Sequence, residues 1–196
     1  LEVGEPSRHL KERLEARPLR LVFPSNQTSN CEDTMSRLDS VIARLMAQRV
    51  CLEFAASELN GHPGCVLELG LGNGRTYDHI RGLMPDRRIY VFDRRIAAHE
   101  DTIPLEEFTY LGEMSDSLPR AAGELGMAAI LVHADIGGGN QEQSNRNAAV
   151  IGPLLPPLLL PGGLVAVDQE LNCPELQPIR PPKEVPDRRY FMYIRI

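Results

Sequence analysis

The apolar residues between positions 33 and 60 recur mostly at three- and four-residue spacing, which predicts one long helix or two consecutive helices. Upstream, residues 5–16 form a candidate short amphipathic helix, and residues 18–30 have the Pro, Ser and Asn content of a linker or extended arm. We therefore expect residues 1–61 to be an N-terminal arm and helical extension that precedes the main domain.

From residue 62 onward, short apolar runs alternate with helical stretches, a pattern typical of a parallel sheet covered on both faces by helices. The predicted strands cover residues 65–69, 88–92, 107–111, 128–133 and 163–168. The predicted helices cover residues 75–84, 115–125 and 141–152, with a weaker one near 97–101. This pattern predicts an α/β domain over residues 62–196.

The end of the chain adds a sixth strand to this prediction. Residues 188–196 (RRYFMYIRI) are aromatic and β-branched and leave no room for a following helix, so we expect a strand antiparallel to the fifth. The connecting stretch, residues 173–186, is so rich in proline that we expect it to be irregular. Its segment IRPPKEVP is either a rigid connector or a segment that shapes an acceptor pocket.

Composition limits the classes of partner. The chain has 196 residues and a net charge of −6, so it has no strong positive field with which to gather nucleic acid or an anionic membrane. The first twenty residues are too charged for a secretory signal, and no apolar run is long enough to span a membrane, so a cytoplasmic protein is expected. The four widely spaced cysteines indicate reduced thiols without a disulfide framework or a zinc site.

Residues 66–74 (VLELGLGNG) place three glycines at alternate positions directly after a predicted strand. At such a strand end, the N-terminus of the next helix faces the crevice in which open α/β sheets bind ligands. Glycines there let the backbone approach a ligand and adopt positive φ, although a tight turn without a ligand uses glycine in the same way. The stretch alone does not decide between these readings.

Three further features narrow the ligand. The spacing is ExGxGxG, with Glu68 ahead of Gly70, rather than the dinucleotide spacing GxGxxG. A second strand ends in Asp93, where a carboxylate can accept hydrogen bonds from both hydroxyls of a ribose. Residues 159–163 read LLPGG directly before another β run.

In this order, the segments VLELGLGNG, IYVFD and LLLPGGLVAV resemble the class I S-adenosylmethionine-dependent methyltransferases over about residues 62–170. More narrowly, LELGLGNGRTYDHI and VHADIGGGN resemble a group of compact bacterial methyltransferases of unassigned substrate. The resemblance implies a Rossmann-like three-layer sandwich with strand order 3-2-1-4-5 plus the antiparallel last strand. It also implies S-adenosyl-L-methionine as cofactor.

The resemblance further implies roles for the residues at the strand ends. Glu68 would lie near the ammonium group of the cofactor, or else be a buried carboxylate held by backbone donors. Asp93 would bind the ribose, unless it caps a helix or pairs with a neighbouring arginine. The residues implied to contact the cofactor are Glu68, Gly70, Gly72, Asn73, Gly74, Asp93, Arg94, Glu113 and Met114. Glu113 and Met114 would flank the adenine. Alternatively, Ser115 or Asp116 in this segment only caps the next helix.

Transfer of a methyl group from a sulfonium is an in-line displacement, so a general base is needed only for a protonated nucleophile. His133 and Asp135, in the segment HADIGGG, are the candidate catalytic residues, because both lie at the carboxyl edge of the sheet. His133 could equally be a half-buried strand residue. Asp135, Asp168 and Gln169 stand where metal-dependent O-methyltransferases hold magnesium, but the longer Gln169 fits octahedral geometry poorly, and we predict no metal.

The main hypothesis is a methyltransferase that acts on a small or medium-sized acceptor. The alternatives are a nicotinamide-dependent oxidoreductase and a catalytically silent cofactor-binding subunit. Without an NPPY-type stretch after the fourth strand, a nucleic-acid base is not supported as acceptor. Such helical extensions often cover the site or build a dimer contact, so a homodimer through residues 33–60 is also a candidate.

Overall fold

A computed structural model describes residues 36–137 and 140–196. The predicted helix over residues 5–16 and the linker over residues 18–30 lie outside the described residues. The compact unit runs from Met35 to Ile196. The long N-terminal helix and the sheet both lie within this unit.

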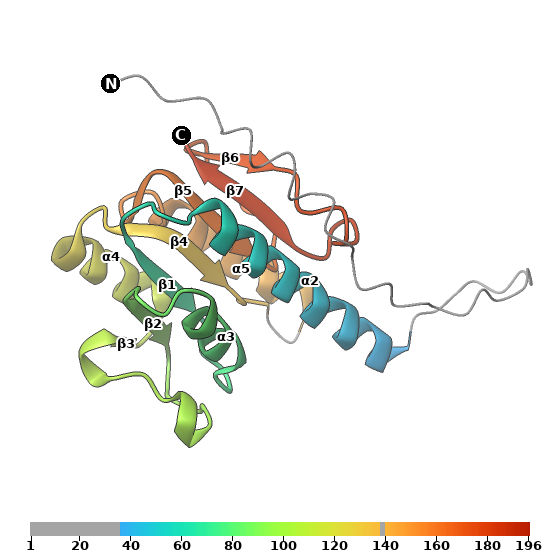
Figure 1. Ribbon diagram of the computed structural model, residues 1–196, viewed down its shortest axis with the longest axis horizontal. Helices are drawn as coiled ribbons and strands as arrows, with labels where there is room; N and C mark the ends of the chain where they lie inside the picture. The colour runs from blue at the N-terminus through green and yellow to red at the C-terminus, as the bar shows by residue number, and fades with distance from the viewer. Residues whose placement is uncertain (1–35, 138–139) are drawn as a thin grey trace, which may run out of the picture. The chain divides into compact units, whose positions relative to one another are not determined.

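The centre of the unit is a seven-stranded sheet with strand order β3-β2-β1-β4-β5-β7-β6 (Figure 1). The strands are β1 (Cys65–Leu69), β2 (Ile89–Asp93), β3 (Thr109–Leu111), β4 (Ala129–Ala134), β5 (Leu159–Val167), β6 (Leu176–Ile179) and β7 (Phe191–Arg195). Strands β1 to β5 run parallel, and β7 pairs antiparallel with both β5 and β6. The predicted order and the antiparallel last strand are confirmed.

The helices form a layer on each face of the sheet. They are α2 (Arg37–Glu58), α3 (Arg75–Leu83), α4 (Met114–Leu125) and α5 (Gln141–Ile151). Three short 3-10 helices, η2 (Glu100–Thr102), η3 (Glu106–Phe108) and η4 (Gly152–Leu154), complete the connections. The buried residues of α2 and α3 belong to one apolar cluster and those of α4 and α5 to another, which places the two pairs on opposite faces.

One prediction about the sheet was wrong. The Pro-rich stretch is not irregular throughout, because Leu176–Ile179 forms the edge strand β6, which makes the sheet seven-stranded rather than six-stranded. Proline cannot donate to a ladder, but an edge strand needs only one of its sides for pairing. Pro178 sits in register with Tyr193 at that edge, so the strand forms despite its proline.

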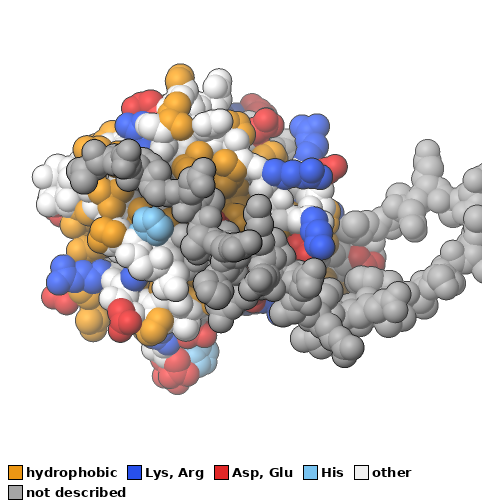
Figure 2. All heavy atoms as spheres, turned by 45° about the horizontal axis from the view of Figure 1, so that its top comes forward, with side chains coloured by type: hydrophobic (Ala, Val, Ile, Leu, Met, Phe, Trp, Pro, Cys, Tyr) orange, Lys and Arg blue, Asp and Glu red, His pale blue; other side chains and the backbone are white. Residues whose placement is uncertain are grey.

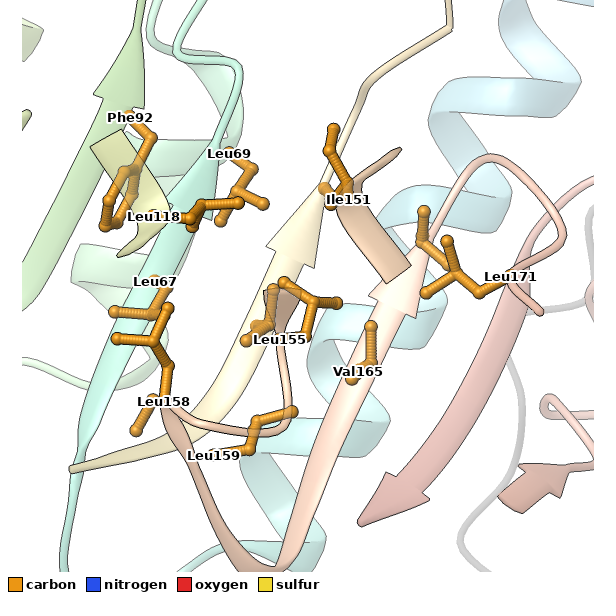
Figure 3. Packing of buried hydrophobic residues seen from close by; sticks show 14 of the residues in the cluster. Leu67, Leu69, Phe92, Leu118, Ile151, Leu155, Leu158, Leu159, Val165 and Leu171 are labelled. Carbon is orange, nitrogen blue, oxygen red and sulfur yellow. The ribbon is translucent and has the colours of Figure 1, made fainter. Parts of the chain in front are cut away.

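The core explains why the parallel strands read as continuous apolar runs. All five residues of β1 and all six of β4 are buried, because helices cover both faces of these central strands. Figure 3 shows the cluster on the α4 and α5 side, where Leu67, Leu118 and Leu155 pack together with their neighbours. Glu68 and His133 are buried in these two strands as well, and they are the exceptions that need partners.

No helix in the described part of the chain is long and apolar enough to cross a membrane. Figure 2 shows one face of the molecule, on which Lys and Arg side chains lie beside Asp and Glu side chains. The cysteines that the structure describes, Cys51, Cys65 and Cys173, are buried free thiols, as predicted.

Candidate functional site

The glycine turn joins β1 to α3 and has the predicted backbone geometry. Gly70, Gly72 and Gly74 all have positive φ, at 90°, 53° and 85°. The turn is also tight, because a Cβ on Gly70 would lie 2.7 Å from the carbonyl oxygen of Asp135 at the end of β4. Only glycine meets both demands without strain, so this turn brings bare backbone to the carboxyl edge of the sheet.

Gly70→Ala should lower the free energy of unfolding by about 1–3 kcal/mol, because the new Cβ meets backbone and the residue keeps a left-handed conformation. Urea denaturation measures this change. Gly82→Ala in α3 is the matched control, since a Cβ there meets nothing within 4 Å and alanine favours a helix. Equal stability of Gly70→Ala and the unsubstituted protein would contradict the tight turn.

Asp93 ends β2 beside this turn. Its Oδ2 accepts a hydrogen bond from the backbone N–H of Gly72 at 3.1 Å, and its Oδ1 accepts one from the N–H of Arg95 at 3.3 Å. The carboxylate is thus held by backbone donors, and neither a helix cap nor a bond to the Arg94 guanidinium occupies it. Arg94 pairs instead with Glu113, Nε to Oε1 at 3.4 Å.

Two adjoining pockets lie along this edge. The larger encloses about 790 Å³ and the smaller about 230 Å³. Both are lined by Gly70, Asp93 and Asp135, so they form one continuous crevice over the ends of β1, β2 and β4. A volume in this range is typical of small-molecule sites. The larger pocket is lined by Gly70, Asp93, Arg94, Arg95, Gly112, Glu113, Met114, Ser115, Asp135, Ile136, Gly137, Gln143, Asn147, Val150 and Ile151.

Glu113 and Met114 line the larger pocket, where the start of α4 approaches the end of β2. Glu113 itself stands at the N-cap position of α4, with no hydrogen bond from its side chain to the helix. The alternative in which Ser115 or Asp116 caps the helix is therefore wrong. The carboxylate of Glu113 remains largely exposed and lies in the pocket wall.

Glu68 lies behind the crevice rather than in it. Its side chain has no exposed surface, one oxygen accepts a short hydrogen bond from the Thr76 hydroxyl, and the other accepts one from His133 Nδ1 at 2.6 Å. With both oxygens occupied and no path to solvent, Glu68 does not face the pockets in this structure. This position does not support the predicted contact of Glu68 with the cofactor. The alternative, a buried carboxylate held by backbone donors, also differs from the structure, because the groups that donate to Glu68 are the side chains of Thr76 and His133.

His133 is also fully buried, beside Glu68 on the neighbouring strand. Its Nε2 lies 2.5 Å from the hydroxyl oxygen of Tyr190 and 3.4 Å from Gln48 Nε2. Burial lowers the pKa of His133, but the charge and hydrogen bond of Glu68, with Asp135 and Asp168 farther away, raise that pKa overall. This position does not support a role of His133 as the general base that deprotonates an acceptor, because both nitrogens of the imidazole ring already have hydrogen-bond partners.

Asp135 is the candidate catalytic residue that the structure brings into the crevice. Its side chain is 30% exposed and lines both pockets. Oδ2 accepts a hydrogen bond from Arg44 Nη1 at 2.7 Å and one from Gln48 Nε2 at 3.3 Å. Arg44 and Gln48 were missed from the sequence, although two polar residues four apart on the apolar face of a helix were a visible signal.

Asp168 is held by backbone donors from the segment that follows Asp135. Its oxygens accept hydrogen bonds from the backbone N–H groups of Ile136 and Gly137, each at 2.9 Å. Burial, and then the nearby charge of Asp135, raises the pKa of Asp168. Among the residues that the structure describes, no group of three or more His, Cys, Asp or Glu side chains could hold a metal ion. The magnesium alternative thus gains no support.

Comparison with known proteins decides the family. The family described as S-adenosyl-L-methionine methyltransferase matches residues 35–195, which is nearly the whole described part of the chain. The chain belongs to the S-adenosyl-L-methionine methyltransferase family. The order of β1 to β5 and the antiparallel β7 agree with that assignment.

One solved structure of a methyltransferase has the same fold. The crystal structure of an S-adenosyl-L-methionine methyl transferase from Silicibacter pomeroyi DSS-3 is 42% identical, with a TM-score of 0.78, over 82% of this chain and 99% of that one. Among curated proteins, none matches this chain.

Two further solved methyltransferases are more distantly similar to this chain. The MycE methyltransferase of the mycinamycin biosynthetic pathway, in complex with Mg and SAH, is 15% identical, with a TM-score of 0.47, over 81% of this chain and 48% of that one. Human N-acetylserotonin methyltransferase, in complex with SAM, is 18% identical, with a TM-score of 0.41, over 65% of this chain and 34% of that one.

Proposed function

We propose that this methyltransferase transfers the methyl group of S-adenosyl-L-methionine to a small or medium-sized acceptor by in-line displacement. The observation that carries the proposal is the continuous crevice in which the glycine turn, Asp93 and Asp135 meet. One part of this crevice suits a nucleoside and the other an amino acid, and these are the two halves of the cofactor.

The larger pocket would hold the adenosine part. The Asp93 carboxylate is fixed by two backbone N–H groups and still borders both pockets, so it can accept hydrogen bonds from ribose hydroxyls. Glu113 and Met114 offer an acceptor and an apolar surface to the adenine, and the ion pair between Arg94 and Glu113 would help to place that carboxylate.

The smaller pocket would hold the methionine part. Arg44 and Arg75 line it and can face a carboxylate, while Asp135 can face an ammonium group. The Asn73 side chain supports this arrangement, because with its amide oxygen turned towards Arg75 that oxygen lies 2.7 Å from Nη2. Asp135 thereby takes the role that the sequence suggested for Glu68.

The cofactor supplies an electrophilic methyl group on a sulfonium. The protein would hold donor and acceptor in line over Gly70, which lines both pockets together with Asp135. Where the acceptor starts out protonated, Asp135 is a carboxylate of the crevice that could take the proton, and its pairing with Arg44 and Gln48 fixes its orientation.

A thermal-shift assay tests the ligand class. S-Adenosylhomocysteine at about 100 times its dissociation constant should add about 2.7 kcal/mol of stability, which is a rise in Tm of several degrees for a chain of this size. NAD at the same concentration should leave the Tm unchanged. A shift with NAD alone would support the oxidoreductase alternative, and turnover of any acceptor in a screen would exclude a silent binding subunit.

The homodimer through residues 33–60 stays a prediction. The N-terminal half of α2 exposes Leu38, Val41 and Ile42, with exposed fractions of 68%, 46% and 50%. These three residues recur on one side of the helix, which is the pattern expected of a contact between copies. Light scattering, which measures the mass in solution, tests the predicted homodimer. A monomeric mass would contradict it.

A further inference from the structure

A connected set of buried polar side chains lies in the sheet layer beneath α2 and α3. Glu68, His133 and Tyr190 are exposed by 0%, 0% and 1%, and they are joined in series at 2.6 Å and 2.5 Å. Glu68 and His133 stand in register on β1 and β4. Tyr190 comes from the other end of the chain, just before β7, and its ring stacks on His133 with centroids 6.1 Å apart.

Two members of this series connect to the wall of the smaller pocket. Glu68 accepts the hydrogen bond of Thr76 in the first turn of α3, directly after the glycine turn. His133, in the middle of the series, has its Nε2 3.4 Å from Gln48 Nε2, and Gln48 donates to the Asp135 carboxylate. Thr76, Gln48 and Asp135 all line that pocket.

Burying these polar and charged side chains costs free energy that a purely structural role would not explain. The neighbours of Glu68 and His133 in β1 and β4 are apolar, and a buried ionic pair is often no more stabilising than apolar side chains of the same volume. A satisfied buried network does fix its members in one geometry. The residues fixed here are those that border the methionine part of the proposed site.

We infer that Tyr190 is a positioning residue for the cofactor site: its hydroxyl holds His133 and Glu68, which hold Thr76 and the glycine turn in the conformation that binds the cofactor. The inference rests on the proposed function. Tyr190 is absent from the lining of both cofactor pockets, so any effect on the cofactor must pass through the intervening residues.

Tyr190→Phe in the full chain tests this inference, with S-adenosylhomocysteine binding followed by calorimetry. Removing the hydroxyl should weaken binding about 3- to 10-fold, the equivalent of one buried hydrogen bond. Tyr193→Phe is the matched control. The Tyr193 hydroxyl is also buried and accepts the N–H of Leu171 at 2.8 Å, but it does not touch the series. The control should lose a similar amount of stability and bind S-adenosylhomocysteine as before.

The double variant Thr76→Val, Tyr190→Phe distinguishes coupling through the series from a general loss of stability. Coupling through the series predicts that Tyr190→Phe costs little further affinity once the Thr76 hydroxyl is gone. Unchanged affinity of Tyr190→Phe, equal weakening by Tyr193→Phe, or losses that multiply in the double variant would each overturn the inference. Failure of the unsubstituted protein to bind S-adenosylhomocysteine would overturn the proposed function instead.

Discussion

Replacing His133 by leucine should lower the free energy of unfolding by about 3–5 kcal/mol, the largest stability change expected of any single substitution considered. The reason is the fate of Glu68, which has no exposed surface and would lose its partner at 2.6 Å while Thr76 alone remains. Leucine fills a similar volume, so the loss would report the unpaired carboxylate rather than a cavity. Urea denaturation followed by circular dichroism measures it.

The double variant Glu68→Leu, His133→Leu is the control for this prediction. Removing both partners takes away the buried charge, so the double variant should be more stable than His133→Leu alone. It will still lose the hydrogen bonds of Thr76 and Tyr190, at about 1 kcal/mol each. A double variant less stable than the single one would contradict the buried pair.

Asp93→Asn should produce the largest loss of cofactor affinity, about 10- to 100-fold for S-adenosylhomocysteine. Asparagine keeps the shape and can still accept from the Gly72 N–H, but it has no charge and one acceptor oxygen fewer for the ribose hydroxyls. Isothermal titration calorimetry measures the loss.

Asp78→Asn is the matched control, because Asp78 is an exposed carboxylate on α3 that pairs with Arg81 at 2.8 Å away from both pockets. It removes the same charge from the protein and should leave the affinity unchanged. An equal effect of the two substitutions would mean that Asp93 acts through net charge rather than through contact with the ribose.

The parallel core could be predicted from the sequence because its strands are short, apolar and separated by helices with clear periodicity. β1 was predicted with its observed bounds, and β2 and β4 to within one residue. The edge strand β6 could not be found in this way. Pro178 argues against a strand on local grounds, and only pairing with β7 at the sheet edge makes it one.

The site was predictable where its geometry follows from backbone position. Gly70 and Asp93 lie at strand ends, and parallel topology alone brings those ends to one edge. The orientation of side chains was not predictable for Glu68 and His133. In a strand that is buried on both faces, apolar residues occupy both the inward and the outward positions. The sequence then lacks the alternation of polar and apolar residues that would show which face of the sheet a carboxylate points to. The partner Tyr190 comes from the far end of the chain, and no local pattern links it to either residue.

A crystal structure with S-adenosylhomocysteine bound tests the central claim most directly. The account predicts the adenosine in the larger pocket with its ribose hydroxyls on Asp93, the amino-acid end in the smaller pocket near Arg44 and Arg75, and the sulfur over Gly70 facing Asp135. Glu68 and His133 should remain without contact to the ligand. A ribose bound away from Asp93, or an ammonium group in direct contact with Glu68, would contradict it.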